Sequence, residues 1–486
     1  MGDENLGYTP EEALSAIGFG KFQALTLVYA GLGWISEALE MMILPFVGIA
    51  VHSEWGISPG EESLLTTVVF IGMLFGAYFW GFISDAYGRR KGFLGVTIAV
   101  VVAAICSAFS PNYKLLLVFR CLLGFGVGGG HTFASWFLEF VSIPNRGAWL
   151  LALTGFWTCG TILEAFFAWI IMPRLGWRWL ISLSCVPSFF VLVLYGLTTE
   201  SPRYLATKGR TAEAQKILEE VAVTNGTKLP LGVLVCDKAI KIDEENSPSL
   251  DTPLLPSARE KNHYPETCLS SFLALFSTKL RRTTLLIWIL YFANTFSYYG
   301  VVLLTSELSS EQSTCHSTTN VLKSVNDGRL YRDVLIATMA ELPGLILEAT
   351  IVDRIGRKLS MEIMCIFGFI LLLPLVVQQN EIVTTALLFG SRMFIFSTFN
   401  LIVLYSREVY PTSVRASGVG IATSIGRIGG MICPLVAVGL VRGCHQTAAI
   451  LLFEAMIILV GSCIFFLPFE TSGKGLRDTL PSSDEE

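Results

Sequence analysis

A polar motif occurs twice in this chain of 486 residues. The segment from Gly81 to Lys91 reads GFISDAYGRRK, and the segment from Ala349 to Lys358 reads ATIVDRIGRK. Their aspartates, Asp85 and Asp353, are separated by more than half of the chain. Each copy lies at the edge of a long apolar segment. A motif that recurs in the same setting indicates a duplicated domain.

Two pairs of glutamates repeat at almost the same separation as the aspartates. Glu139 corresponds to Glu408, and each is followed by an arginine at the seventh position after it. Glu200 corresponds to Glu470, and each ends a block of apolar segments. The whole chain, rather than one motif, is therefore expected to be duplicated.

The composition is that of a membrane protein. The mean hydropathy is +0.60 and only 15% of the residues are charged, against about 25% in soluble domains. The net charge of −5 gives no basic surface for nucleic acid. The segment from Met1 to Gly20 is polar and acidic, so no cleavable signal peptide is expected.

Twelve segments are long enough to cross a bilayer, which takes roughly 20 apolar residues each. In the first half they are 22–50, 63–83, 93–110, 115–138, 148–171 and 178–198. In the second half they are 284–306, 333–352, 359–379, 382–405, 417–440 and 446–467. The expected fold is all-α, with two six-helix bundles related by a pseudo-two-fold axis.

The flanking segments complete this division. Residues 1–21 form an N-terminal segment, 22–198 the first bundle, 199–283 a linker, 284–467 the second bundle and 468–486 a tail. Residues 240–262 of the linker are rich in Pro, Ser and acids, so we expect them to be disordered. Cys315 and Cys444 fall in loops on the same side and are candidates for a disulfide, although connectivity cannot be read from a sequence.

Basic residues in short loops predict the orientation. The loops that carry the repeated motif are rich in Lys and Arg, and the opposite short loops are poor in them. The positive-inside rule therefore places the motif loops and both termini in the cytosol.

Several motifs resemble the major facilitator superfamily over essentially the whole chain. The segment from Gly81 to Lys91 resembles its loop signature between the second and third helices, and RCLLGFG from Arg120 resembles its fourth-helix motif. Glu200-Ser-Pro-Arg203 resembles the sugar-porter signature after the sixth helix, and Pro468-Phe-Glu470 its second copy. The resemblance implies a secondary transporter.

A narrower resemblance comes from the N-terminal region. YTPEEA from Tyr8, IGFGKFQ from Ile17 and SEALEMM from Ser36 are similar to the synaptic-vesicle-two-related group. Within it, the chain looks most like the plant organic cation/carnitine type that includes nicotinate transporters. Ala349 departs from the signature glycine, and Arg407 stands where relatives usually carry a small residue.

Charged residues of the loop motifs are candidates for gating. Asp85 is expected to cap the third helix and to pair with Arg89 or Arg146. Such pairs would tie the two halves together in one state and break in the other; alternatively, the charges serve topology alone. The full gating set is Asp85, Arg89, Glu139, Arg146, Glu200, Arg203, Asp353, Arg357, Glu408, Arg415 and Glu470.

Ionisable residues inside the spans are candidates for proton coupling, because charges are costly in lipid. Glu37 and Glu40 are three residues apart and share one face of the first helix. By resemblance to proton-coupled sugar porters, Glu37 is expected to pair with Arg120. A carboxylate that alternates between a proton and an arginine can couple the two; a static ion pair is the alternative. Glu164 is a second candidate.

Arg427, inside the eleventh span, is the main candidate for substrate binding. In related organic-ion carriers, this place tends to hold Arg when the substrate is an anion. A substrate carboxylate would satisfy the guanidinium by a forked hydrogen bond, whereas an internal partner such as Glu454 is the alternative. Arg392, which corresponds to Arg120, is expected to be structural.

Other candidate substrate contacts are aromatic or polar. His131 lies three helical turns beyond Arg120 and is expected on the same face. It either binds the ligand or hydrogen-bonds a neighbouring helix. Packing is the alternative for each aromatic residue. The remaining set is Trp157, Asn294, Phe296, Tyr298 and Tyr299.

These observations predict alternating-access transport of a small organic ion, most simply nicotinate with a proton. An organic cation or carnitine carrier, a sugar symporter and a non-transporting ligand-binding relative are the alternatives. No nucleophile–base pair, metal cluster or phosphate loop appears in the sequence, so we expect neither an enzyme nor a cofactor. The plasma membrane, with an internal membrane as the alternative, and a monomer are expected.

Overall fold

The computed structural model describes residues 7–142, 146–235, 275–277, 280–311, 328–377, 379–410, 412–442, 445–468 and 470–471. Within these ranges, twelve helical segments are long and apolar enough to cross a membrane. They coincide with the twelve predicted spans, with ends that differ by a few residues. The predicted disordered stretch, Cys315 and Cys444 lie outside the described residues.

The first six spans form the N-terminal half, and several of them consist of two helices. They are α2 (Lys21–Met42) with α3 (Leu44–Trp55), α4 (Pro59–Tyr87), α5 (Arg89–Ala108), α6 (Tyr113–Val127) with α7 (His131–Leu138), α8 (Arg146–Leu175), and α9 (Trp177–Ser184) with α10 (Val186–Val193) and the 3₁₀-helix η2 (Leu194–Leu197).

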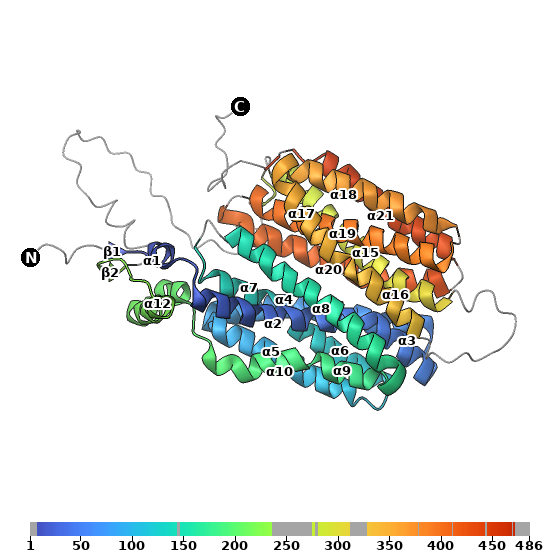
Figure 1. Cartoon of the computed structure of the whole chain (residues 1–486), viewed down its shortest axis with the longest axis horizontal. Coiled ribbons are helices and arrows are strands. Elements are labelled where there is room, and N and C mark those ends of the chain that lie inside the picture. Colours follow the sequence, from blue (N-terminus) through green and yellow to red (C-terminus); the bar gives the residue numbers. More distant parts are fainter. Residues whose placement is uncertain are drawn as a thin grey trace, which may run out of the picture.

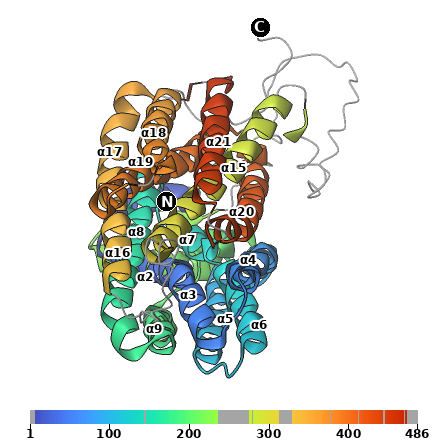
Figure 2. The ribbon, with the colours of Figure 1, turned by 90° about the vertical axis from the view of Figure 1, so that its right-hand side faces the viewer.

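The other six spans form the C-terminal half. They are α15 (Arg281–Glu311), α16 (Gly328–Met339) with α17 (Glu341–Ile355), α18 (Arg357–Leu372) with the 3₁₀-helix η3 (Leu373–Val376), α19 (Glu381–Val409), α20 (Thr412–Arg442) and α21 (Gln446–Phe465). The two halves lie one above the other (Figures 1 and 2). Where they meet, α16 packs on α8 and α20 packs on α4.

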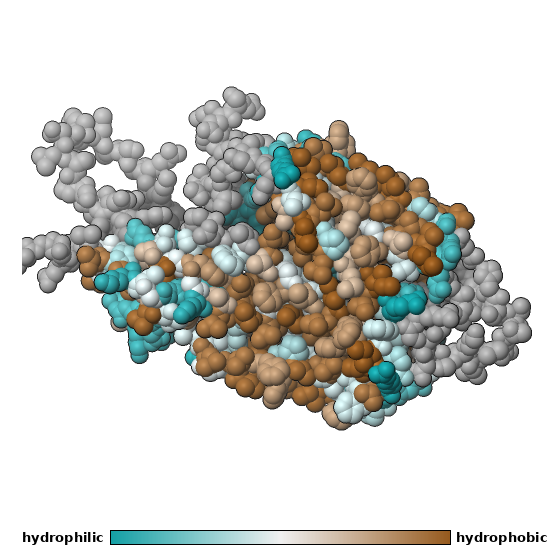
Figure 3. Space-filling view, viewed as in Figure 1, coloured by the Kyte–Doolittle hydropathy of each residue, from teal (hydrophilic) through white to brown (hydrophobic). Residues whose placement is uncertain are grey.

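The outer surface of the bundle is apolar around its middle (Figure 3). Side chains of the spans that are more than 60% exposed include Phe75, Phe82, Trp179, Ile346 and Phe465. A soluble protein rarely exposes so large an apolar surface. In a bilayer these side chains face lipid, as expected for a twelve-span protein.

Glycines allow α4 and α6 to cross at close range. A Cβ atom on Gly72 or Gly76 would overlap the backbone of α6, and one on Gly124 would overlap the backbone of α4 at Val69. Small residues let helix backbones approach closely in lipid, where the hydrophobic effect does not drive helices together. These glycines therefore fix the position of α6, which carries Arg120.

A small subdomain covers one end of the N-terminal half, which we call the α12 end. It contains α1 (Pro10–Ile17), α11 (Pro202–Thr207) and α12 (Thr211–Asn225), with strand β1 (Gly7–Tyr8) parallel to β2 (Val233–Leu234). Thr9 and Glu12 form a capping box at the start of α1. The subdomain lies at the left of Figure 1, away from α9, which marks the opposite end.

Asn225, the last residue of α12, ties this subdomain to the first span. Its Oδ1 accepts a hydrogen bond of 3.0 Å from the backbone N–H of Phe22, and its Nδ2 donates to Gln23 at 2.7 Å. It therefore satisfies a free N–H group at the start of α2.

The substitution Asn225→Ala should destabilise the protein by about 1 kcal/mol, the usual cost of losing such a cap. The expected result is a lower apparent melting temperature in detergent. Asn225→Asp keeps the acceptor oxygen and should lose much less. Equal losses in the two variants would contradict a capping role.

Candidate substrate, coupling and gating sites

The repeated loop motif builds an equivalent Arg–Glu ion pair in both halves at the α12 end. In the N-terminal half, the Arg89 guanidinium contacts the Asp85 carboxylate and lies 2.8 Å from Glu139. In the C-terminal half, Arg357 lies 3.1 Å from Glu408. These pairs join residues of the same half. The structure therefore brings the predicted gating partners together, but within each half rather than between the halves.

Glu200 caps the third span, a role that the sequence assigned to Asp85. Its Oε1 accepts a hydrogen bond of 3.1 Å from the backbone N–H of Arg90. Asp85 cannot reach this position because it precedes the turn and is drawn to the Arg89 guanidinium. A carboxylate at a helix N-terminus also interacts favourably with the helix dipole.

The second half repeats this cap. Glu470 accepts hydrogen bonds from the backbone N–H groups of Arg357 at 2.9 Å and Lys358 at 3.0 Å. The preceding residues, Gly88 and Gly356, have φ values of 116° and 91°, which side chains disfavour. The turn therefore requires the glycine of the signature. The hydrogen bonds that Glu200 and Glu470 accept depend on the same turn, because the N–H groups that donate them come directly after it.

Of the remaining gating candidates, two contact other described residues and two have side chains outside the described part of the structure. Arg203 contacts the Glu11 carboxylate of α1 and lies 3.4 Å from the Val141 carbonyl oxygen. Arg415 donates to the Tyr410 carbonyl at 3.1 Å. The side chains of Arg146 and Asp353 lie outside the described part of the structure.

Tyr204 also holds the N-terminal loop motif in place. Its hydroxyl donates to the Ala86 carbonyl oxygen at 3.0 Å. Partial burial, together with the nearby Glu200 carboxylate, raises the pKa of Tyr204. The phenol therefore remains a neutral hydrogen-bond donor at physiological pH.

A buried charge cluster occupies the middle of the N-terminal half. Arg120 on α6 pairs with Glu40 on α2 at 3.3 Å, and both side chains are at most 1% exposed. Glu164 on α8 lies close enough to both to interact electrostatically and accepts a hydrogen bond from Ser184 at 2.7 Å. The sequence predicted these residues as coupling candidates, and the structure brings them together.

The predicted partner of Arg120 was wrong, because Glu40 rather than Glu37 forms the pair. A spacing of three along a helix separates the two carboxylates by about 4.5 Å along the axis and turns them by about 60°. Glu40 is thereby level with Arg120, whereas Glu37 lies nearer the α12 end and lines a separate small cavity. That cavity has a volume of about 20 Å³ and is also lined by Ser36, Thr97 and Ser188.

A second buried ion pair lies in the C-terminal half. Arg392 on α19 pairs with Glu341 on α17 at 2.7 Å, and neither side chain is exposed. Tyr298 donates its hydroxyl hydrogen to the same carboxylate at 2.9 Å. Arg392 thus has a carboxylate partner within its own half, which is the arrangement expected of a structural residue. The sequence analysis missed Glu341, although a carboxylate inside the eighth span was a usable signal.

Arg427 lies on α20 where it meets α4. Among the described residues, its hydrogen-bond partner is the backbone carbonyl oxygen of Met73, to which Nη1 donates. Glu454, the alternative partner, lies elsewhere in the half, and both of its buried carboxylate oxygens lack a hydrogen-bond partner. The guanidinium therefore has no partner carboxylate within ion-pair distance among the described residues.

A glycine turn, Gly128–Gly130, places the candidate Glu37 beside Arg427. Gly128 packs against the backbone at Met73, whose carbonyl binds Arg427, and the Glu37 carboxylate lies against Gly130. The charges of Glu37 and Arg427 are near enough to interact across the two halves. The turn thus brings a cation of one half and a carboxylate of the other to one place.

The same turn corrects the placement of His131. The sequence analysis counted three continuous helical turns from Arg120, but α6 ends at Val127 and α7 begins at His131. The His131 ring nitrogen Nδ1 lies 3.2 Å from the Gly128 carbonyl oxygen, and the side chain is exposed. Its charge interactions include Arg427, so it still borders the predicted site.

Aromatic side chains flank this region from both halves. The Tyr299 ring of α15 meets Phe70 of α4 edge-on, at 4.9 Å between centroids. Trp157 of α8 meets Trp34 of α2 at 6.5 Å and 81°. Trp157 and Tyr299 pack against the same N-terminal cluster, which includes Phe70 and Met73. The sequence analysis missed Trp34, which precedes Glu37 by less than one helical turn.

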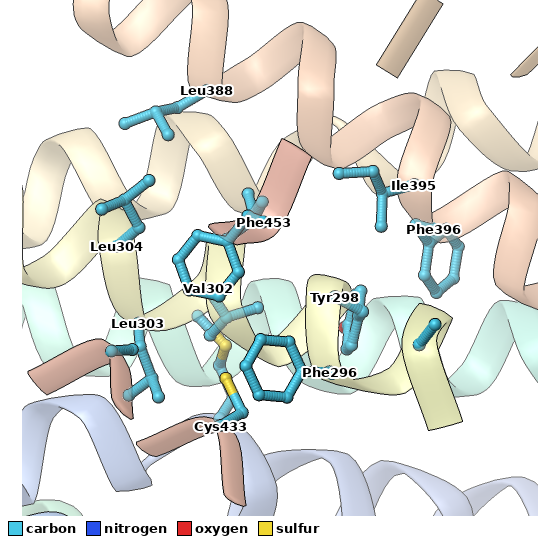
Figure 4. Close-up of a cluster of buried hydrophobic side chains, with 14 of the residues drawn as sticks. Phe296, Tyr298, Val302, Leu303, Leu304, Leu388, Ile395, Phe396, Cys433 and Phe453 are labelled. Carbon is cyan, nitrogen blue, oxygen red and sulfur yellow. The ribbon is translucent and has the colours of Figure 1, made fainter. Parts of the chain in front are cut away.

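Two other residues of the seventh span are buried. Phe296 is 2% exposed and packs in the C-terminal core, where Phe453 lies 5.7 Å away (Figure 4). Asn294 is 2% exposed and its Nδ2 has no partner. Successive helix positions are turned by about 100°, so one span cannot direct Asn294, Phe296, Tyr298 and Tyr299 at one ligand. The packing alternative therefore accounts for Phe296, and its role as a ligand contact stays a prediction.

Comparison with known proteins identifies the family to which this twelve-span chain belongs. A family model described as "Sugar (and other) transporter" matches residues 50–479. The chain belongs to this family of the major facilitator superfamily. It is 51% identical to "Organic cation/carnitine transporter 7" of Arabidopsis thaliana over 100% of this chain and 99% of that protein. It is 38% identical to "Synaptic vesicle 2-related protein" of Xenopus laevis, over 96% and 82% of the two chains.

Solved structures confirm the fold of this major facilitator protein. The partially occluded inward-open xylose transporter XylE of E. coli matches with a TM-score of 0.71 at 17% identity, over 95% of this chain and 100% of that chain. The same symporter with 6-bromo-6-deoxy-D-glucose matches with a TM-score of 0.64 at 18% identity, over 95% and 98%. The chain is thus a multi-pass secondary transporter of a small molecule rather than an enzyme.

Proposed function

We propose that this transporter carries nicotinate or a similar aromatic monocarboxylate together with a proton, by alternating access. The observation that carries the proposal is the state of Arg427. This part-buried guanidinium lies between the two halves, and a backbone carbonyl is its hydrogen-bond partner among the described residues. A ligand carboxylate can still bind its remaining N–H groups in a forked geometry.

The surroundings of Arg427 suit a flat ring. Phe70 belongs to the N-terminal cluster, and Tyr299 and Trp157 pack against it. Trp34 meets Trp157. Aromatic rings prefer edge-on or offset contacts with each other, which add to the energy of burial. An aromatic acid would use both the charge and these rings.

Glu37 provides a means of coupling to protons. Its carboxylate interacts electrostatically with Arg427 and would repel a second carboxylate bound there. A proton on Glu37 removes this repulsion, so proton binding and anion binding favour each other. In this proposal Glu40 and Arg120 hold the N-terminal half together, while Glu37 takes up the proton. The motif loops and both termini lie in the cytosol, and the membrane is the plasma membrane.

Carnitine or another organic cation is the second candidate, because the Arabidopsis relative carries that name. A quaternary ammonium group would need an aromatic or acidic partner. Glu40 and Glu164 are already engaged by Arg120 and Ser184, which leaves Glu37 with the Trp34–Trp157 pair. Carnitine itself also has a carboxylate that Arg427 would bind.

Uptake into proteoliposomes distinguishes these candidates. Labelled nicotinate should enter faster when the outside is more acidic than the inside, and empty liposomes correct for diffusion of the neutral acid. Benzoate should compete, whereas nicotinamide, which has the same ring without the charge, should not. Uptake of a quaternary ammonium ion with no nicotinate uptake would overturn the proposal.

A further inference from the structure

The buried ion pair of the C-terminal half extends into the N-terminal half. Glu341 Oε1 binds Arg392, at 2.7 Å from Nη2, and accepts from the Tyr298 hydroxyl at 2.9 Å. The other oxygen, Oε2, accepts a hydrogen bond of 2.9 Å from the Thr161 hydroxyl of α8. Glu341 and Arg392 are fully buried, and Thr161 is 2% exposed. One carboxylate thus joins the two halves.

Arg392 makes a second contact across the same boundary. Its Nη2 lies 3.6 Å from the Met42 sulfur at the end of α2. Thr161 lies within one helical turn of Glu164, and Met42 lies within one turn of Glu40. The two contacts therefore connect the C-terminal ion pair to α2 and α8, which are two of the three helices that carry the N-terminal charge cluster.

We propose that the Glu341–Thr161 hydrogen bond holds the halves together in this state and breaks when the transporter opens toward the end opposite α12. Phe46 and Tyr331, whose rings are 5.8 Å apart, lie beyond it on that side and also belong to different halves. Opening there requires the two halves to separate along α8 and α16, which pack together. The inference depends on the transporter fold and not on the identity of the substrate.

The partners of Glu341 make this bond easy to release. Arg392 and Tyr298 belong to the C-terminal half and would move with Glu341, so the carboxylate keeps its charge partner when Thr161 leaves. Breaking a buried ion pair is costly because it leaves an unpaired charge, and this arrangement avoids that cost. When Thr161 leaves Glu341, its single hydroxyl hydrogen can be donated instead to the Thr158 carbonyl oxygen of its own helix, which lies 2.9 Å away.

The test measures the distance between the halves directly. Spin labels are introduced as a noncanonical amino acid at Lys114 and Glu381, two exposed positions at the end opposite α12 in different halves. The full-length protein is studied in lipid by pulsed electron paramagnetic resonance. Thr161→Val should increase the ratio of open to closed distances about tenfold, because it removes a hydrogen bond to a charged group.

Two matched variants control this result. Thr158→Val removes a buried hydroxyl one turn away that has no hydrogen-bond partner, so it should leave the distances unchanged. Thr161→Ser restores the hydroxyl and should restore the closed population. If Thr161→Val does not give monodisperse protein, Thr161→Ala is measured instead. Unchanged distances without the hydroxyl, or an equal change in Thr158→Val, would overturn the inference.

Discussion

Replacing Arg427 with Ala should lower the transport efficiency (kcat/KM) for an aromatic monocarboxylate by at least about 100-fold. The substitution removes charge-assisted, forked hydrogen bonds to the ligand, which are among the strongest that proteins make. It also leaves the Glu37 carboxylate without the opposite charge near it, so a bound anion would be repelled. Initial rates of labelled nicotinate uptake in proteoliposomes measure the loss.

Two variants separate ligand binding from general damage. Arg427→Lys keeps the charge but not the planar fork, so it should recover only part of the uptake. Arg407→Ala removes another partly buried arginine of the same half and restores the small residue that relatives usually carry there. It should transport normally. Nicotinate uptake that survives Arg427→Ala would remove the basis of the anion proposal.

The repeated motif made most of the fold predictable from the sequence. Asp85, Glu139 and Glu200 predicted their counterparts, and the two glutamates of each half form equivalent contacts around Arg89 and Arg357. Apolar runs located all twelve spans because lipid requires about 20 apolar residues for each. The ends were less accurate. For example, α4 begins at Pro59, before the apolar run, because Ser58 and Glu61 form a capping box there.

Details inside the spans could not be predicted from spacing alone. The break at Gly128–Gly130 turns His131 relative to Arg120, and a run of glycines does not state where a helix ends. Glu37 and Glu40 lie within about one helical turn of each other. Resemblance and spacing alone do not show which of the two carboxylates is level with Arg120. Contacts across the two halves, such as Thr161 with Glu341, depend on how separate bundles meet.

The buried charges differ in what they can do because their partners differ. Arg120 and Arg392 each have a carboxylate partner inside one half, whereas Arg427 has a carbonyl partner from the other half. The charges of Arg120 and Arg392 are already balanced by a carboxylate, although Nε and Nη2 of Arg120 and Nη1 of Arg392 have no hydrogen-bond partner among the described residues. A guanidinium without a paired carboxylate gains both a balancing charge and a forked interaction from an anionic ligand. Arg427 is therefore a better candidate for ligand binding than the two more deeply buried arginines.

Arg120→Ala should be the most destabilising substitution considered, at about 3–5 kcal/mol, because it removes one partner of a buried pair. Glu40 and Glu164 would remain as two buried carboxylates without a cation. The measurement is the apparent melting temperature of the detergent-solubilised protein, which should fall well below that of the wild type.

Two further variants show whether the loss comes from the unpaired charge. Arg210→Ala is the matched control, since Arg210 pairs with Glu213 at 2.6 Å with both side chains more than half exposed, and exposed pairs contribute little. The double variant Glu40→Gln/Arg120→Met removes both charges of the pair and should melt at a higher temperature than Arg120→Ala alone. If Arg120→Ala melted like Arg210→Ala, the N-terminal cluster would not depend on its arginine, and the two carboxylates would have to be neutral in the folded protein.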